Sequence, residues 1–194
     1  MTAGIAGLPA AGFPGPITFL TMFDAATLQW GTSDFTVLAV ARATAQTASD
    51  GMLYVKEGPD PYDGPALFLN SDKPAPSTLA AAQISGAIYV ESVPPPTTFV
   101  DSSVHLLAAR RAGSTLEIRV DAAVSQSLTS MAIATTDVSA PGSDVMIGQN
   151  GYTPTFEFQQ FHGEIAEIVG IVGSVEVDEL SDVEQYLKSR YAIP

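Results

Sequence analysis

The strongest constraint on the fold is the C-terminal part of the chain, which has the pattern of one long strand followed by one helix. Residues 161–172, with the sequence FHGEIAEIVGIV, are rich in β-branched side chains. Their apolar residues fall on both faces of an extended chain. A strand of this kind is stable only when it is covered on both faces, so we expect it to lie inside a sheet.

The helix is expected directly after this strand, over residues 180–191. Ser181 precedes Glu184 by three residues, which is the spacing of a capping box, so we expect the helix to begin near Ser181. Four large side chains recur at helical spacing and would form one apolar stripe against the sheet: Val183, Tyr186, Leu187 and Tyr191.

Further strand-like segments, separated by turns rich in Gly and Pro, occupy most of the remaining chain. Residues 115–120 show the clearest alternation, with Leu116 and Ile118 between Glu117 and Arg119, which predicts one buried face and one face in water. The other predicted strands are residues 17–23, 33–42, 52–55, 66–69, 84–90, 104–110 and 144–148.

Four of these strings, in this order, resemble laminin-G-like domains of the concanavalin A-like lectin and glucanase family. They are SDFTVLAVAR at 33–42, VDA at 120–122 (with Ala122 where the family has glycine), DVMIG at 144–148, and the C-terminal strand with its helix. The resemblance implies an all-β fold, an antiparallel two-sheet jelly-roll sandwich with one short C-terminal helix. It covers residues 17–194 as a single domain.

Residues 1–16 precede this domain as an extended arm rich in Gly, Pro and Ala, with no charged side chain before Asp24. The arm lacks the basic start of a secretory signal. Ordering it costs about 1–2 kcal/mol per residue, whereas its anchors Ile5, Leu8 and Phe13 each return about 1.5–3 kcal/mol on burial. We therefore expect the arm to pack across a subunit boundary. Deletion of residues 2–16 would then abolish assembly and leave the sandwich folded.

Composition excludes several classes of partner. The net charge is −13 with only eight Lys and Arg residues, so nucleic acid and anionic membranes would be repelled. No apolar run approaches the roughly 20 residues of a membrane span, and the absence of cysteine removes thiolate catalysis. Charged residues form 15% of the chain, against about 25% in ordinary domains. Two readings fit this composition. Part of the surface is buried against neighbouring molecules, or the chain is a β domain with a neutral surface.

Catalysis is not expected. Glycosidases of this architecture carry carboxylates two residues apart on one strand, where they share a groove. Glu164 and Glu167 are three residues apart, which predicts opposite faces and no acid pair. His105 and His162 each lie in a predicted strand without a nucleophile motif, so we interpret them as hydrogen-bonded structural residues.

Two binding sites are candidates in loops. Glu57, Asp60 and Asp63 would offer three hard oxygen ligands to calcium, although a solvated acidic loop is the reading we favour. A glycan needs an aromatic platform with polar neighbours, which Tyr62, or Tyr152 beside Asn150, would supply.

The leading hypothesis is a non-enzymatic assembly or surface protein, such as a decoration, cement or fibre component at the surface of a virus-like particle. Its partners would be copies of itself or a larger particle. The alternative is a glycan-binding, lectin-like module of a bacterial surface or secreted protein, with calcium as the one cofactor considered. Neither hypothesis involves nucleic acid or membrane insertion.

Overall fold

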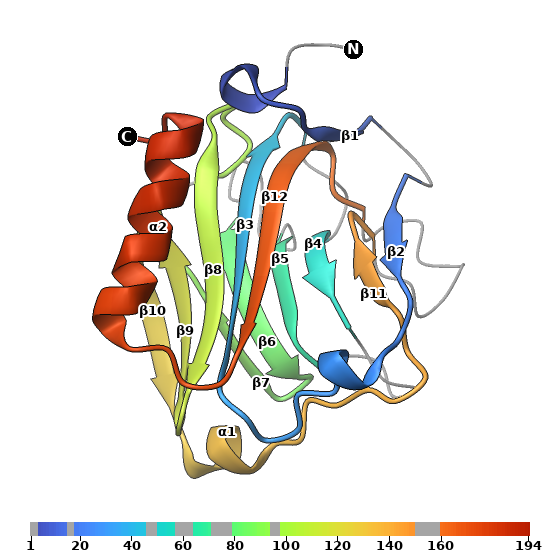
Figure 1. Ribbon diagram of the computed structural model, residues 1–194, viewed down its shortest axis with the longest axis vertical. Coiled ribbons are helices and arrows are strands. Elements are labelled where there is room, and N and C mark those ends of the chain that lie inside the picture. The colour runs from blue at the N-terminus through green and yellow to red at the C-terminus, as the bar shows by residue number, and fades with distance from the viewer. Residues whose placement is uncertain are drawn as a thin grey trace.

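Two six-stranded antiparallel sheets pack face to face, as the jelly-roll prediction requires (Figure 1). The computed structural model describes residues 4–14, 18–45, 50–56, 64–70, 79–93, 98–149 and 160–194. Sheet A has the order β1 (Ala11–Phe13), β12 (Gly163–Val172), β3 (Phe35–Ala43), β8 (His105–Ala112), β9 (Thr115–Val120), β10 (Ala123–Thr129). Sheet B has the order β2 (Leu20–Met22), β11 (Val145–Ile147), β4 (Gly51–Val55), β5 (Ala66–Asn70), β6 (Leu79–Ser85), β7 (Ile88–Glu91).

The main core lies between the two sheets. Trp30 is buried there, stacked on Tyr54 with ring centroids 5.9 Å apart and tilted against Phe35. A second apolar cluster covers the outer face of sheet A, where Leu38, Val40 and Leu106 meet the C-terminal helix. Strand β3 is therefore covered on both faces. The strand predicted at residues 161–172 is present from Gly163, but it is buried only near its start, at Gly163 and Ile165, while Gly170 and Val172 are exposed.

Four helical segments complete the described residues: η1 (Ile5–Gly7), η2 (Ala26–Leu28), α1 (Met131–Thr135) and α2 (Val177–Tyr191). None of these helices is both long and apolar enough to cross a membrane. Helix α2 begins four residues before the predicted start, because Glu176 and Glu179 form the capping box in place of Ser181 and Glu184. Its buried stripe is Leu180, Glu184, Leu187 and Tyr191, while Tyr186 is 55% exposed.

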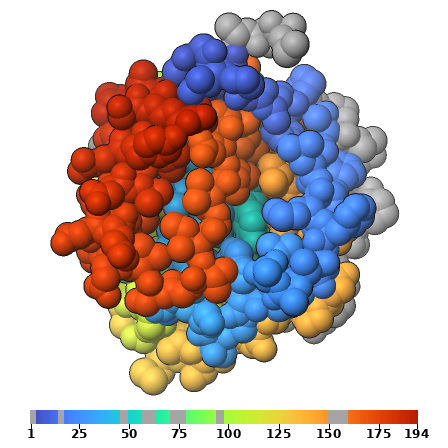
Figure 2. Space-filling model, viewed as in Figure 1, coloured from blue at the N-terminus to red at the C-terminus, as the bar shows by residue number. Residues whose placement is uncertain are grey.

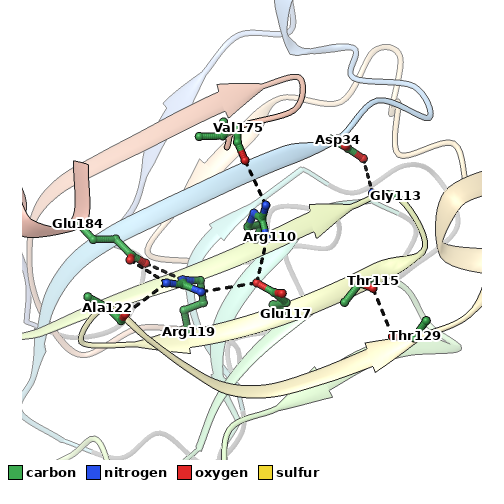
Figure 3. A network of polar contacts seen from close by, with 10 residues as sticks. All are labelled: Asp34, Arg110, Gly113, Thr115, Glu117, Arg119, Ala122, Thr129, Val175 and Glu184. Atoms are coloured by element: carbon green, nitrogen blue, oxygen red, sulfur yellow. Dashed lines mark hydrogen bonds and ion pairs between the residues drawn. The ribbon is translucent and has the colours of Figure 1, made fainter. Parts of the chain in front are cut away.

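Glu184 faces the sheet because it forms an ion pair there (Figure 3). The Arg119 guanidinium donates to both carboxylate oxygens of Glu184, from Nε at 2.7 Å and from Nη2 at 2.9 Å. Arg110 donates to Glu117 at 3.2 Å and to the Val175 carbonyl at 3.1 Å. The face of β9 predicted to be in water thus lies under α2, and its charged residues hold the helix in place.

The arm packs on its own domain, which corrects the expectation of a subunit boundary. Ile5 is fully buried in the cluster under α2, with Leu8 packed partly buried against it, and Phe13 is 1% exposed in the main core. Strand β1 pairs with β12 of the same chain. The free energy that offsets the ordering of the arm therefore comes from two sources within one chain. One is the backbone hydrogen bonding between β1 and β12, and the other is the burial of Ile5 and Phe13 in two apolar clusters. Self-association through other surfaces remains a prediction.

The predicted strand at 84–90 is wrong, since Gly86 and Ala87 form a turn that separates β6 from β7. Most other predicted strands are present with shifted ends. Residues 17–23 shorten to β2, and 144–148 shorten to β11. Strand β10 and the alanine-rich start of β6 were not predicted.

Candidate functional site

The candidate site is a pocket of about 520 Å³ at one end of the sandwich. At this end β3 finishes and β8 and β12 begin, and β1 pairs with the first residues of β12. These elements lie in the upper part of Figure 1. The volume lies within the range of about 300–1,000 Å³ that is usual for small-ligand sites. Its walls combine one ion pair, two hydroxyls and a glycine- and proline-containing backbone: Gly12, Phe13, Pro14, Arg42, Thr44, Ser102, Gly163 and Glu164.

Strand register brings Arg42 and Glu164 together across sheet A, since the two residues are direct partners in the β3–β12 ladder. Arg42 Nη2 donates to Glu164 Oε2, and the two side chains are 31% and 19% exposed. Among the described residues, Arg42 Nε, Arg42 Nη1 and Glu164 Oε1 have no further partner. The pair therefore offers both donors and an acceptor to a molecule in the pocket.

Gly163 allows the strands to approach closely at the pocket wall. A Cβ at this position would lie 2.1 Å from the Arg42 carbonyl oxygen and 2.9 Å from Ala43 Cα, both of them backbone atoms. Any other residue would push β12 away from β3 and separate Arg42 from Glu164. The G in the FHGEIAEI string is thus a steric requirement of the site.

The opposite rim is the segment before β8, which carries Ser102 with φ of 64°. Asp101 accepts a hydrogen bond from the Ser103 amide at 2.8 Å, and its other oxygen lies 3.4 Å from His105 Nε2. His105 Nδ1 lies 2.9 Å from Asp121 Oδ2. These contacts tie the rim to the β9–β10 turn, and they confirm His105 as a hydrogen-bonded structural residue.

The electrostatics of this rim centre on His105. Burial alone would lower the pKa of His105, but the hydrogen bond and charge of Asp121, together with Asp101, outweigh it and raise the pKa above the usual value. His105 therefore bridges two carboxylates, Asp121 and Asp101, at the edge of the pocket.

Glu164 and Glu167 lie on the same face of β12, which corrects the prediction of opposite faces. A bulge at Ala166 interrupts the ladder to β3, so that Glu167 pairs with Val40 while Glu164 pairs with Arg42. The two carboxylates nevertheless have separate partners. Glu167 accepts from the Tyr191 hydroxyl at 2.7 Å and lies 3.6 Å from Arg190 Nε, and Glu164 is held by Arg42. No shared acid pair results from the bulge.

A second hollow of about 350 Å³ lies between the edges of the two sheets, where Figure 2 shows a dip between β12 and β2. Its described walls are almost entirely apolar, with Leu20, Ile147 and Ile168 on them, and Glu167 is the one charged residue among the described lining residues. It offers few of the polar groups that fix a ligand's orientation.

The site residues predicted from loops lie outside the described residues. This applies to Glu57, Asp60 and Asp63, proposed for calcium, and to Tyr62, Asn150 and Tyr152, proposed for a glycan. Within the described ranges, no group of three or more His, Asp or Glu side chains is placed to hold a metal ion.

The pocket residues Arg42, Thr44, Ser102 and Glu164 were not predicted. The one available signal was an arginine at the end of a predicted central strand in a chain with only eight Lys and Arg residues.

Comparison with protein-family models and with curated proteins found no match. Solved structures do share the fold. A putative carbohydrate-binding protein from Bacteroides ovatus is 16% identical with a TM-score of 0.65 over 89% of the chain, which spans only 45% of that protein. The CBM40 of the Ruminococcus gnavus IT-sialidase is 14% identical with a TM-score of 0.64, covering 90% of this chain and 96% of that one.

A heptameric pentraxin from Limulus polyphemus is 12% identical with a TM-score of 0.64, covering 89% of this chain and 80% of that one. The CBM40 structures include complexes with α2,3- and α2,6-sialyllactose. The chain therefore shares the jelly-roll sandwich fold of these structures. The comparisons do not single out laminin-G-like domains among proteins with this fold.

Proposed function

We propose that the chain is a glycan-binding module without catalytic activity, and that its ligand occupies the end pocket beside Arg42 and Glu164. The observation that carries the proposal is the chemistry of this pocket. It places charged donors and acceptors beside the exposed side chains of Thr44 and Ser102, in a volume suited to a sugar. Sugar hydroxyls both donate and accept, so a wall with both kinds of group matches them.

Two further points support the proposal. The fold is shared with carbohydrate-binding proteins, which makes glycan binding the natural first test although fold alone does not assign function. The carboxylates of Glu164 and Glu167 on β12 have separate partners, so these two residues do not form an acid pair for glycoside hydrolysis. The hypothesis of a particle component receives no support from the comparisons. A glycan-binding role would place the protein outside the cell or on a surface.

A glycan array with the purified chain tests the proposal, with Arg42→Gln as the site variant and Arg190→Gln as the matched control. Arg190 also belongs to a partly exposed ion pair, with its side chain 43% exposed, but it lies on α2 and does not line the pocket. We expect binding by the wild type and by Arg190→Gln, and loss of at least about tenfold in affinity for Arg42→Gln. Equal binding by all three proteins would place the ligand elsewhere, and no binding to any glycan would refute the function.

A further inference from the structure

We infer that the ligand of the end pocket is an uncharged sugar whose hydroxyl groups bridge Arg42 and Glu164, rather than an acidic sugar held by its carboxylate. The inference rests on the proposed function and specifies its ligand class. The structural neighbours leave the choice open, because the CBM40 complexes hold sialyllactose, an acidic glycan.

The first reason is the charge balance of the pocket. Among the described residues that line it, only Arg42 and Glu164 are charged, and each neutralises the other. Arg42 keeps free N–H groups and Glu164 keeps a free oxygen within the described part of the chain. Two neighbouring hydroxyls of a sugar would accept from Arg42 and donate to Glu164 while the ion pair stays intact.

An anionic ligand would meet a different situation. Its carboxylate would compete with Glu164 for the same guanidinium and would face the Glu164 carboxylate at short range. Glu164 is only 19% exposed, so displacing it would leave a largely buried charge without a partner. Hydroxyl recognition avoids both penalties.

The second reason is that the described residues offer no other free cation near the pocket. Seven of its eight Lys and Arg residues lie in the described ranges, and each donates a hydrogen bond within the chain: Arg42, Lys56, Arg110, Arg111, Arg119, Lys188 and Arg190. Lys56 and Arg111 are buried, at 0% and 1% exposure. With a net charge of −13, the field of the whole molecule also disfavours an approaching anion.

Matched neutral and acidic glycans provide the test. Titration calorimetry would compare lactose with α2,3-sialyllactose, and an array would extend the comparison to other cores printed with and without sialic acid. The proteins are the wild type, Arg42→Gln, Glu164→Gln, Ser102→Ala and the control Arg190→Gln. Ser102 is exposed, so its variant keeps the test valid if a change in the ion pair unfolds the chain.

We expect neutral cores to bind at least tenfold more tightly than their sialylated forms. Glu164→Gln and Arg42→Gln should each weaken neutral binding on the order of tenfold, and Ser102→Ala by a smaller factor, while Arg190→Gln leaves it unchanged. Tighter binding of sialylated glycans would overturn the inference and leave the proposed function standing. Neutral binding that none of the pocket variants weakens would overturn the assignment of the site. Absence of any glycan binding would overturn the function and the inference together.

Discussion

At the scale of single residues, the turn between β9 and β10 contains a backbone conformation that its sequence does not favour. Asp121 and Ala122 both have positive φ, 50° and 74°, as the central residues of type I′ turns do. Asp121 is compensated, because its carboxylate accepts a hydrogen bond from the Leu106 amide at 2.9 Å and holds His105. Ala122 has no such compensation from its methyl side chain, and glycine is the residue that this position favours.

Ala122→Gly is therefore expected to stabilise the protein by about 0.5–1 kcal/mol, because it removes left-handed strain that exceeds the extra entropy of the unfolded chain. Urea unfolding measures the difference. The matched control is Ala123→Gly, one residue on in the extended strand β10, which is expected to destabilise by a similar amount. If both variants lowered stability equally, the turn would not carry the strain assigned to it.

His105 makes stability depend on pH. Its folded pKa is raised above the ordinary value of about 6.5. Its contribution is therefore fully present below about pH 6.5 and is lost as the pH rises through the folded pKa. The free energy of unfolding of the wild type, minus that of His105→Gln, should shrink from pH 6 to pH 8.5. A difference that stays constant or grows would contradict the assigned ion pairs.

At the scale of elements, the docking of α2 depends on a buried ion pair as well as on its apolar stripe. Glu184 lies on the buried face of α2, where it is 1% exposed, and both of its carboxylate oxygens accept hydrogen bonds from Arg119. Glu184→Ala would remove the closer of the two carboxylates that pair with Arg119 and leave only Glu117, whose Oε2 lies 3.7 Å from Arg119 Nη1. We therefore expect a loss of about 3 kcal/mol in the free energy of unfolding, at the lower end for breaking a buried ion pair. The exposed pair of Arg190 on the same helix serves as control, and Arg190→Ala should cost less than about 1 kcal/mol.

The double variant Arg119→Met with Glu184→Leu separates charge from packing. It removes both charges and keeps apolar volume, so we expect it to be more stable than Glu184→Ala alone. A guanidinium chloride series on the wild type, Glu184→Ala, the single variants Arg119→Met and Glu184→Leu, and the double variant measures this. If the double variant lost as much as the sum of the two single changes, the pair would act mainly through packing.

The elements that were predicted from the sequence share one property. Each carries large apolar side chains whose burial determines where the element lies in the fold. Strand β3 and residues 161–172 are rich in β-branched residues, and they pair with each other in sheet A, where β12 lies between β3 and the short edge strand β1. Strand β10 has the sequence AVSQSLT and is exposed along almost all of its length, so no burial pattern marks it. The alanine-rich start of β6 has low strand propensity and forms because its neighbours bury it.

The pocket could not be read from local spacing. Arg42 and Glu164 are 122 positions apart and meet only because β3 and β12 pair in one register. The bulge at Ala166 was equally hidden, since a bulge depends on the partner strand. The helix start was misread because Ser181 and Glu184 have the spacing of a cap, whereas Glu176 and Glu179 have the geometry of one.

At the scale of the whole molecule, the two ends of the chain form one structural unit. Ile5 packs with Leu187 and Tyr191 of α2, and β1 extends sheet A beside β12 (Figure 1). Phe13 meets Phe161 edge to face at 6.0 Å and lies over Gly148, where a Cβ would approach its ring to 2.2 Å. The arm therefore belongs to the folding unit, and it also forms one wall of the candidate pocket.

This arrangement predicts that removing the arm destabilises the sandwich itself. Phe13→Ala should cost about 3–5 kcal/mol and Ile5→Ala about 2–5 kcal/mol, because each leaves a cavity in a buried cluster. Leu8→Ala is the control and should cost less, since Leu8 is only partly buried.

Deleting residues 2–13 should lower the thermal midpoint by more than either single change. It should also weaken the binding of any glycan beside Arg42, because Gly12 and Phe13 line that pocket. Circular dichroism melts and sedimentation measure both folding and assembly. A truncated chain with an unchanged midpoint and a smaller assembly would instead restore the arm as an intersubunit connection.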